Sequence, residues 1–524
     1  MRSREDCMSP KIRRWDWKFW TALCAATLFL SHSAAAGEAC DSPQDPEAAI
    51  VDCTQSIKSG KWKGSHLAAF YSNRAAAYRA TGDSDRAMAD LNEAIRLDPK
   101  LAMAFNNRGA AYNEKGDNDR AIADYNEAIR LDPKLAMAFS NRGNAYNDKG
   151  DTDHAIADYS EAIRLEPTLA RAFQNRGSAW HDKGDNDRAI ADYNEAIRLE
   201  PDHAMAFFGR GMAFSDKDDN DRAVADFNEA IRLDPTFAAA FDHRGSAWQE
   251  KGDLDRAIAD FSEAIRLAPG RARPFNHRGR AYLEKDDLDR AVADYSEAIR
   301  IDPEDAGAFN YRGSAYQARG DLDRAIADYN ESIRLDPKSA RALVSRGIAF
   351  GDKGDADRAT ADYDEAIRIN PKSTLGYFAR GRSSLFAGSL EKALADFNQA
   401  SANAPENAYL ALWVDIVSRR NKLPGRLAET SSKIDMTAWP APVVRLFMDQ
   451  TTPAAVLAAA DDPDATKKRS QLCEANFYSG ELALTKGLRD EATRLFRLAA
   501  NDCPHGFTEW DSANAELKAL GAVP

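Results

Sequence analysis

The sequence predicts an all-α fold, a solenoid of stacked helical hairpins. Three observations predict it. A proline recurs every 34 residues, small and aromatic residues recur between these prolines at three- and four-residue steps, and 44% of the 524 residues are hydrophobic, enough for a continuous core. Because each unit of a solenoid contacts mainly its neighbours, the chain can form one long structure instead of several separate domains. The prolines are Pro99, Pro133, Pro167, Pro201, Pro235, Pro269, Pro303, Pro337, Pro371 and Pro405.

Residues 102–135 illustrate how one unit specifies a hairpin. A first helix is predicted up to about Lys115, where a Gly-Asp pair ends it. Asp119 is the candidate N-cap of a second helix, which ends before Pro133 because the residue preceding a proline resists helical angles. Small residues are expected where the two helices cross, and aromatic side chains between the layers. These residues are Phe105, Gly109, Tyr112, Ala121, Tyr125 and Ala128.

The same residue types recur in ten consecutive units over residues 68–407, and this pattern resembles the tetratricopeptide repeat (TPR) family. The counterpart of Gly109 is a glycine in every later unit, and only the first unit departs, with Ala75. The resemblance implies that the hairpins stack into a right-handed superhelix whose concave groove binds peptides.

Two rows of opposite charge accompany the repeat. In all ten units an arginine directly precedes the place of the repeat glycine, and an aspartate recurs in the second helix. Arg108 and Asp124 hold these places in one unit, and Arg142 and Asp158 in the next. The matching rows predict structural ion pairs between helices or between layers. The alternative is a stripe that binds anions, which the aspartates would neutralise.

An asparagine row lies two residues before the repeat glycine in the first four units, at Asn73, Asn107, Asn141 and Asn175. In several TPR proteins this place lies on the concave face, so the resemblance implies a row that holds a peptide backbone. Amide side chains both donate and accept hydrogen bonds, and can therefore bind a backbone whatever its side chains. The alternative is that these amides hydrogen-bond neighbouring helices.

The first cysteine pair lies in residues 37–67, a partial N-terminal capping unit. Cys40 and Cys53 take the places of Tyr112 and Tyr125, two aromatic residues that should touch across a hairpin. We therefore predict a Cys40–Cys53 disulfide, which would close a short loop. The alternative is two buried free thiols.

The second pair lies in residues 473–524, which are predicted to form a final TPR-like hairpin and a C-terminal capping helix, because residues 473–506 repeat the spacing of the ten units. Cys473 is expected to open the first helix and Cys503 to close the second. Antiparallel helices bring such ends together, so a Cys473–Cys503 disulfide is predicted. Residues 408–472 break the period and are predicted to form an irregular helical linker that caps the stack.

The stretch 439–520 has a resemblance of its own. Pro442-Val443-Val444, the run from Cys473 to Gly480 and Phe507-Thr508-Glu509 are similar to the C-terminal part of bacterial envelope TPR lipoproteins of the NlpI type. The resemblance implies an adaptor for tail-specific proteases or peptidoglycan enzymes. The chain lacks that family's lipid-bearing cysteine and has many more regular units.

Residues 1–36 are predicted to be a signal peptide. A basic stretch ending at Lys18 precedes an apolar run from Phe19 to Leu30, and cleavage is expected after Ala36. The alternative is an uncleaved anchor helix. After cleavage no stable membrane span is expected. Four cysteines then remain, an even number that agrees with export to an oxidising bacterial periplasm or to the outside.

Composition and motifs argue for binding without chemistry. A net charge of -13 would repel phosphate backbones, which excludes nucleic acid as the expected partner. The sequence contains no Gly-rich phosphate loop, no nucleophile elbow and no metal-ligand cluster, so we predict no enzymatic activity, no cofactor and no metal. The predicted function is an exported scaffold that binds extended peptides or partner proteins in its groove. The alternatives are an envelope adaptor that delivers substrates to a protease or cell-wall enzyme, and a secreted effector.

Overall fold

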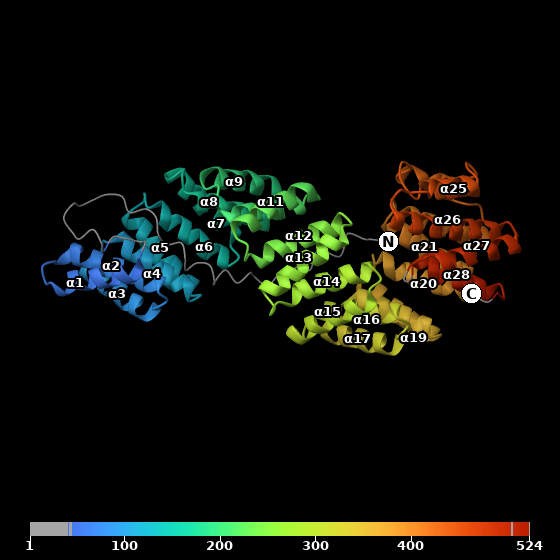
Figure 1. Cartoon of the computed structure of the whole chain (residues 1–524), viewed down its shortest axis with the longest axis horizontal. Coiled ribbons are helices and arrows are strands. Elements are labelled where there is room, and N and C mark those ends of the chain that lie inside the picture. The colour runs from blue at the N-terminus through green and yellow to red at the C-terminus, as the bar shows by residue number, and fades with distance from the viewer. Residues whose placement is uncertain (1–39, 41–44, 505–506, 523–524) are drawn as a thin grey trace. The chain divides into compact units, whose positions relative to one another are not determined.

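The computed structural model describes residue 40 and residues 45–504 and 507–522. Within that part of the chain the regular elements are α1 to α28 and one short 3-10 helix, with no strand (Figure 1). The predicted all-α class of stacked helical hairpins is confirmed. The predicted signal peptide, residues 1–36, lies outside the described residues.

The chain divides into two compact units, Met1–Ala247 (unit 1) and Trp248–Pro524 (unit 2). In unit 1 a single helix, α1 (Pro46–Lys58), precedes five hairpins. Their first helices are α2 (Gly64–Ala80), α4 (Ala102–Glu114), α6 (Ala136–Asp148), α8 (Ala170–Asp182) and α10 (Ala204–Ser215). Their second helices are α3 (Ser84–Leu97), α5 (Asn118–Leu131), α7 (Thr152–Leu165), α9 (Asn186–Leu199) and α11 (Asn220–Leu233).

Helix α12 (Ala238–Glu250) includes the boundary, and unit 2 continues the repeat after it. The first helices of unit 2 are α14 (Ala272–Glu284), α16 (Ala306–Ala318), α18 (Ala340–Asp352) and α20 (Thr374–Phe386). The second helices are α13 (Leu254–Leu267), α15 (Leu288–Ile301), α17 (Leu322–Leu335), α19 (Ala356–Ile369) and α21 (Leu390–Asn403).

The cap of unit 2 follows α21. Its helices are α22 (Ala408–Arg420), α23 (Leu427–Thr430), the 3-10 helix η3 (Ser431–Lys433), α24 (Ala441–Phe447), α25 (Pro453–Ala459), α26 (Ala465–Thr485), α27 (Arg489–Asp502) and α28 (Thr508–Ala519). The expectation that Cys473 opens a helix was wrong, because α26 begins at Ala465. Residues 465–472 extend α26 by about two turns before the first residue of the repeat pattern, and the 34-residue period does not encode this extension.

Local sequence fixes the turn inside each hairpin. In the second hairpin Gly116 has φ +77°, a left-handed angle that favours glycine, and the next residue, Asp117, caps α5. The Asp117 carboxylate accepts a hydrogen bond from the backbone N–H of Arg120 at 3.2 Å. The expectation that Asp119 is the N-cap was therefore wrong. Asp119 lies in the first turn of α5, where its carboxylate accepts a hydrogen bond from Lys149.

The crossing of the two helices explains the repeat glycine. A Cβ added at Gly109 would lie 2.7 Å from Cε1 of Tyr125 and 3.1 Å from the carbonyl oxygen of Ala121. Tyr125 and Ala121 are buried, and they form a small core with Ala145 of the next hairpin. Each layer is thus closed by its successor, as expected for a solenoid.

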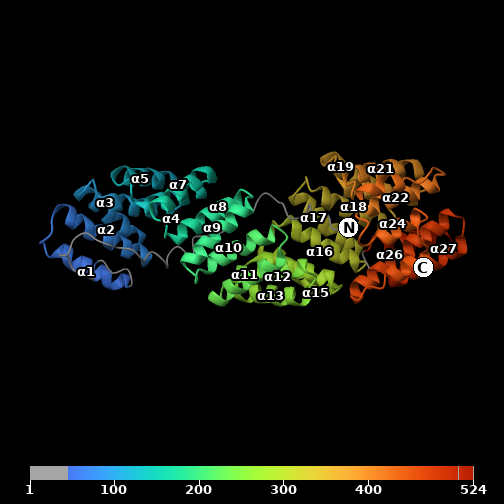
Figure 2. The ribbon, with the colours of Figure 1, turned by 90° about the horizontal axis from the view of Figure 1, so that it is seen from above.

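Within each unit, the first helices of successive hairpins pack against one another, as α4 does against α6, whereas successive second helices approach less closely. Figure 2 shows the hairpins of each unit from above, each stacked on the next. The first helices therefore line the inner side of each unit, and the second helices its outer side.

Candidate functional site

The candidate site is the inner face of unit 1, the side on which α2, α4, α6, α8 and α10 contact one another. We define this inner face by an asparagine row, a pair of methionines and an acidic row. Its residues are Asn73, Asn107, Asn141, Asn175, Met103, Met137, Glu114, Asp148, Asp182 and Asp216.

The asparagine row links successive first helices. The Nδ2 group of Asn107 donates to Oγ of Ser72 at 3.2 Å, and that of Asn141 donates to Oδ1 of Asn106 at 3.0 Å. Nδ2 of Asn175 also donates to the preceding first helix, at Oδ1 of Asn144 (2.9 Å), and all three asparagines are half-buried. The Nδ2 groups therefore make the hydrogen bonds to neighbouring helices that the sequence offered as the alternative to peptide binding. Asn73 is half-buried at the same place on α2.

Two methionines lie beside this row. Nδ2 of Asn106, a residue only 1% exposed, lies 3.9 Å from the sulfur atoms of both Met103 and Met137. Met137 is 41% exposed and is one of the few large apolar side chains that face solvent. Methionine adapts its shape to different contacts, so the pair offers a soft apolar surface next to the amides.

The acidic row was missed by sequence reasoning. It lies at the C-terminal ends of the first helices, five residues after the repeat glycine in the second to fifth hairpins. Asp148 accepts a hydrogen bond from Nδ2 of Asn113 at 2.8 Å, and Asp216 is 2.9 Å from Nε2 of His181. The fixed spacing of an acid after each glycine was the signal that could have revealed the row.

Asp182 is an exposed member of the acidic row, at the end of α8. Its side chain contacts solvent, yet the surrounding protein raises the pKa of its carboxyl group through desolvation. Glu114 differs, because its carboxylate forms an ion pair with Arg79.

The predicted arginine and aspartate rows come together inside hairpins of both units. Arg108 binds Asp124 through two parallel hydrogen bonds of 2.8 Å, and Arg142 binds Asp158 through two of 2.7 Å. Hydrogen bonding to the aspartate is the main cause that raises the pKa of each of these arginines.

The same guanidinium groups also join successive hairpins. Nη1 of Arg108 donates to Oδ1 of Asn92 on α3 at 3.0 Å, and Nη1 of Arg142 donates to Asn126 on α5 at 2.6 Å. The arginine therefore holds together its own two helices and the preceding second helix. This arrangement favours structural ion pairs over an anion-binding stripe. We call the paired arginine and aspartate rows the arginine ladder.

Both predicted cysteine pairs are disulfide-bonded. Cys40 and Cys53 have their Cα atoms 5.1 Å apart, and Cys473 and Cys503 have theirs 4.7 Å apart. The first bond pins residue 40 to α1 beside Phe70, and the second ties the middle of α26 to the end of α27.

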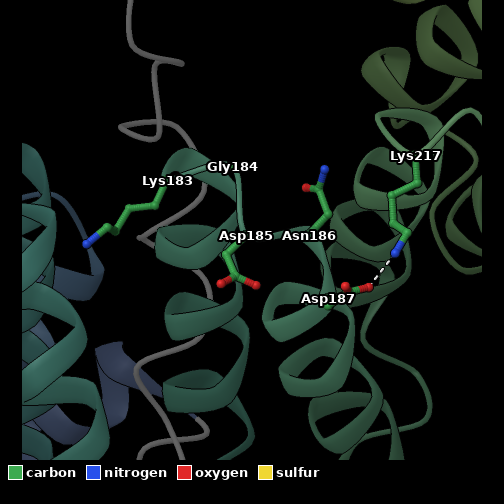
Figure 3. A pocket seen from close by; sticks show the side chains of 6 residues that line it. All are labelled: Lys183, Gly184, Asp185, Asn186, Asp187 and Lys217. Carbon is green, nitrogen blue, oxygen red and sulfur yellow. Dashed lines mark hydrogen bonds and ion pairs between the residues drawn. The ribbon is translucent and has the colours of Figure 1, made fainter.

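A surface hollow lies between the turns of the fourth and fifth hairpins (Figure 3). Its charges serve the scaffold, because Lys217 bonds Asp187 within the hollow and Lys183 bonds Asp153 of the preceding hairpin. The same arrangement recurs around Lys115 and Lys149. The lining residues are Lys183, Gly184, Asp185, Asn186, Asp187 and Lys217.

In residues 45–504 and 507–522, together with Cys40, no three side chains of His, Cys, Asp or Glu converge as metal ligands would. In the same part of the chain no helix combines the length and apolarity that crossing a bilayer requires.

Comparison with known families identifies the repeat. The family models described as "TPR repeat" and "Tetratricopeptide repeat" together match a continuous span from residue 75 to residue 374. The matched segments of the first are 75–116, 109–150 and 143–184, and those of the second are 182–238, 208–272, 243–306, 277–340 and 311–374.

Several solved structures are similar to parts of this chain. A crystal structure of MamA is 28% identical and covers 30% of this chain and 93% of that one, with a TM-score of 0.29. YrrB, described as a TPR protein with an unusual peptide-binding site, is 23% identical and covers 35% and 95%, with a TM-score of 0.31. Yeast Tom70 is 16% identical and covers 78% and 96%, with a TM-score of 0.41.

Proposed function

We propose that this chain, which belongs to the tetratricopeptide repeat family, is a non-enzymatic scaffold that binds extended segments of other proteins along the inner face of unit 1. The ligand would lie across the first helices, with its backbone at the asparagine row and its side chains against Met103 and Met137.

The observation that carries this proposal is how the asparagine row uses its amides. The Nδ2 groups of Asn141 and Asn175 bind the preceding helix, whereas among the described residues no group donates a hydrogen bond to the Oδ1 atom of either. Each Oδ1 is therefore available to a backbone N–H of a ligand. The amides can thus hold the helices together and still offer an acceptor.

A peptide-selection experiment tests this proposal. Peptides selected from a random library against the full chain should bind the Asn141→Ala/Asn175→Ala double variant about tenfold more weakly, because two hydrogen bonds are lost. The matched control is Asn126→Ala/Asn194→Ala. These asparagines lie on second helices, where each accepts from a ladder arginine. Equal losses in both double variants, or a selection that yields no peptide, would contradict the proposal.

We further propose that the protein is exported and works in the bacterial periplasm or outside the cell. The support is the signal-like pattern of residues 1–36 and the two disulfides, since disulfides persist in oxidising compartments. Mass spectrometry of protein purified from the native cell should find Gly37 at the N-terminus and no free thiol. A chain that retains residues 1–36 in a reducing fraction would overturn this proposal.

An envelope adaptor is the second candidate, with the cap docking a tail-specific protease or a peptidoglycan enzyme. The specific support is the resemblance of residues 439–520, together with two exposed apolar residues of the cap, Leu488 (56% exposed) and Leu498 (37% exposed). Removing Trp439 onward would expose buried Trp413, which contacts Phe477, so point variants are the better test. Leu488→Asp/Leu498→Asp should abolish co-purification of such an enzyme, and unchanged co-purification would count against this role.

A further inference from the structure

We infer that the inner face of unit 1 selects a basic ligand: an extended segment of another protein whose lysine or arginine side chains lie along the acidic row at the ends of α6, α8 and α10. This inference rests on the proposed function and specifies the chemistry of its partner.

The first argument is that most other charges of the repeat are already paired. Salt bridges of three kinds recur: between the two helices of a hairpin, along a second helix, and between a turn and the preceding hairpin. Examples are Arg108–Asp124, Arg130–Glu127 and Lys149–Asp119. These pairs cancel within the scaffold and leave little charge for a ligand.

Asp148, Asp182 and Asp216 of the acidic row are exceptions. Among the described residues Asp148 and Asp182 form no ion pair with a lysine or an arginine, and the hydrogen-bond donor to Asp148 is the neutral amide of Asn113. In the described part of the chain, the charged partner of Asp216 is the imidazole of His181, at 2.9 Å. The lysine that follows each of these acids is directed to the second helix of the preceding hairpin, as Lys149 is to Asp119.

The helices add to the negative potential of this edge. The acids stand in the last turns of first helices, where unpaired backbone carbonyl groups already carry partial negative charge and a basic residue would be the usual choice. Arg171, an exposed cation, lies near the opposite end of α8.

The repeat also sets the spacing of the ligand. Packed helices lie roughly 8–10 Å apart, and an extended chain advances about 3.3–3.6 Å per residue. One carboxylate per first helix therefore matches a basic side chain at about every third ligand residue. Such a ligand would place its backbone along the asparagine row and its charges at Asp148, Asp182 and Asp216.

Three synthetic peptides of equal length test the inference on the full chain. They share one backbone pattern and carry lysine, glutamine or glutamate at every third position. Fluorescence anisotropy should give an affinity for the lysine peptide about tenfold above that for the glutamine peptide, with the advantage shrinking as salt is added. The glutamate peptide should bind most weakly.

Matched variants locate the effect. Asp148→Asn/Asp182→Asn/Asp216→Asn keeps side-chain size, and an amide oxygen can still accept from Asn113. This triple variant should reduce the lysine peptide to the affinity of the glutamine peptide. The control Asp119→Asn/Asp153→Asn/Asp187→Asn makes the same charge change at exposed acids that bridge lysines, and should leave the preference intact.

The outcomes separate the inference from the proposed function. Equal affinities for the lysine and glutamine peptides, or equal losses in the two triple variants, would overturn the basic preference while peptide binding stands. If no peptide of any charge binds, and the library selection also fails, the proposed function falls and this inference falls with it.

Discussion

The inner face of unit 1 and the matching face of α26 in the cap occupy the same place in a hairpin but differ in what covers them. In α26 the repeat glycine is Gly480, so Glu474 and Tyr478 correspond to Met137 and Asn141 of α6. Met137 is 41% exposed, whereas Glu474 is 8% exposed and Tyr478 is fully buried. We call the stacked hairpins of unit 1 the array. The same helix pattern thus forms an exposed surface in the array and part of the core in the cap.

The covering elements explain the difference. In the cap, α22, α24 and α28 pack against α26, and these helices form one hydrophobic core with the last repeat. The carboxylate of Glu474 receives hydrogen bonds from α22 and from Trp439. The hydroxyl of Tyr409 donates to Glu474 at 2.8 Å and the indole N–H of Trp439 donates to it at 2.7 Å. Where another hairpin follows, as in unit 1, the same face stays partly exposed to solvent.

The comparison predicts its largest effect at Arg420. Nη2 of Arg420 lies 2.5 Å from Glu481 and Nη1 lies 2.8 Å from Glu516, and both carboxylates are buried. Arg420→Ala would leave two buried charges without a cation and should lower the free energy of unfolding of the cap by about 3–5 kcal/mol. Urea denaturation, with hydrogen exchange of α26 and α6 followed separately, measures the loss.

The array supplies the control for that experiment. Protection of α6 should not change, because unit 1 folds around its own small cores. Adding Glu481→Gln should recover part of the loss by removing one buried charge. A loss below about 1 kcal/mol in the single variant would mean that the buried carboxylates are not held as charges, and the contrast with unit 1 would fail.

The next effect is a pH dependence confined to the cap. Burial, reinforced by the nearby Glu509, raises the pKa of Glu474 to about 7 from 4.5. Folding then favours the protonated form, so the stabilisation is fully present below pH 4.5 and is lost as the pH rises through about 7. Between those values the cap should lose on the order of 3 kcal/mol.

Hydrogen exchange of α26 at about pH 5 and about pH 8, on either side of the raised pKa, measures this loss. The neutral variant Glu474→Gln keeps its acceptor oxygen for Tyr409 and Trp439, and should make the cap more stable than wild type at the higher pH. The helices of unit 1 provide the reference over the same range. If cap stability instead rises with pH, Glu474 is charged in the folded protein and the expected direction of the pKa shift is wrong.

A smaller effect is expected at the repeat glycine of the array. Gly109→Ala would place a Cβ 2.7 Å from the ring of Tyr125 and should cost about 1–3 kcal/mol by overpacking. The first hairpin suggests the rescue, because Ala75 is tolerated there opposite Leu91. The double variant Gly109→Ala/Tyr125→Leu should therefore be more stable than Gly109→Ala alone in thermal denaturation.

The cap again sharpens the test. Gly480→Ala meets Phe496 at 2.8 Å within a continuous core, which can relax less than the small core of one hairpin. Its cost should exceed that of Gly109→Ala. Equal costs at the two glycines would show that a repeat layer is as rigid as the cap.

Sequence reasoning reached the parts of the molecule that the 34-residue period encodes. It predicted the hairpins, both cysteine pairs and the pairing of Arg108 with Asp124, since each follows from the spacing within one unit. It missed the cap at Asp117, because two aspartates stand two residues apart and only the backbone angles show which one precedes the helix.

Sequence reasoning did not predict the acidic row or the buried carboxylates of the cap, for a different reason. The partner of Asp148, Asn113, lies 35 residues away on another hairpin, so nothing local shows that its charge stays uncompensated. Glu474 reads as an ordinary surface residue of a helix until α22 and Trp439 are placed over it. Properties that depend on what covers a face cannot be read from the pattern of that face.

The smallest expected effect concerns the arginine ladder. Its ion pairs are more buried than the pairs on the surface and less buried than those in the cap. The side chains of Arg108 and Asp124 are 20% and 10% exposed. Arg108→Lys keeps the charge but loses the paired hydrogen bonds to Asp124 and the bond to Asn92, so a cost of about 1 kcal/mol is expected. Arg130→Lys, in an exposed pair with Glu127, should cause no measurable change in the free energy of unfolding. If both substitutions are silent, packing alone holds the layers and the ladder belongs with the surface pairs; if Arg108→Lys costs as much as Arg420→Ala, the array holds its charges as tightly as the cap.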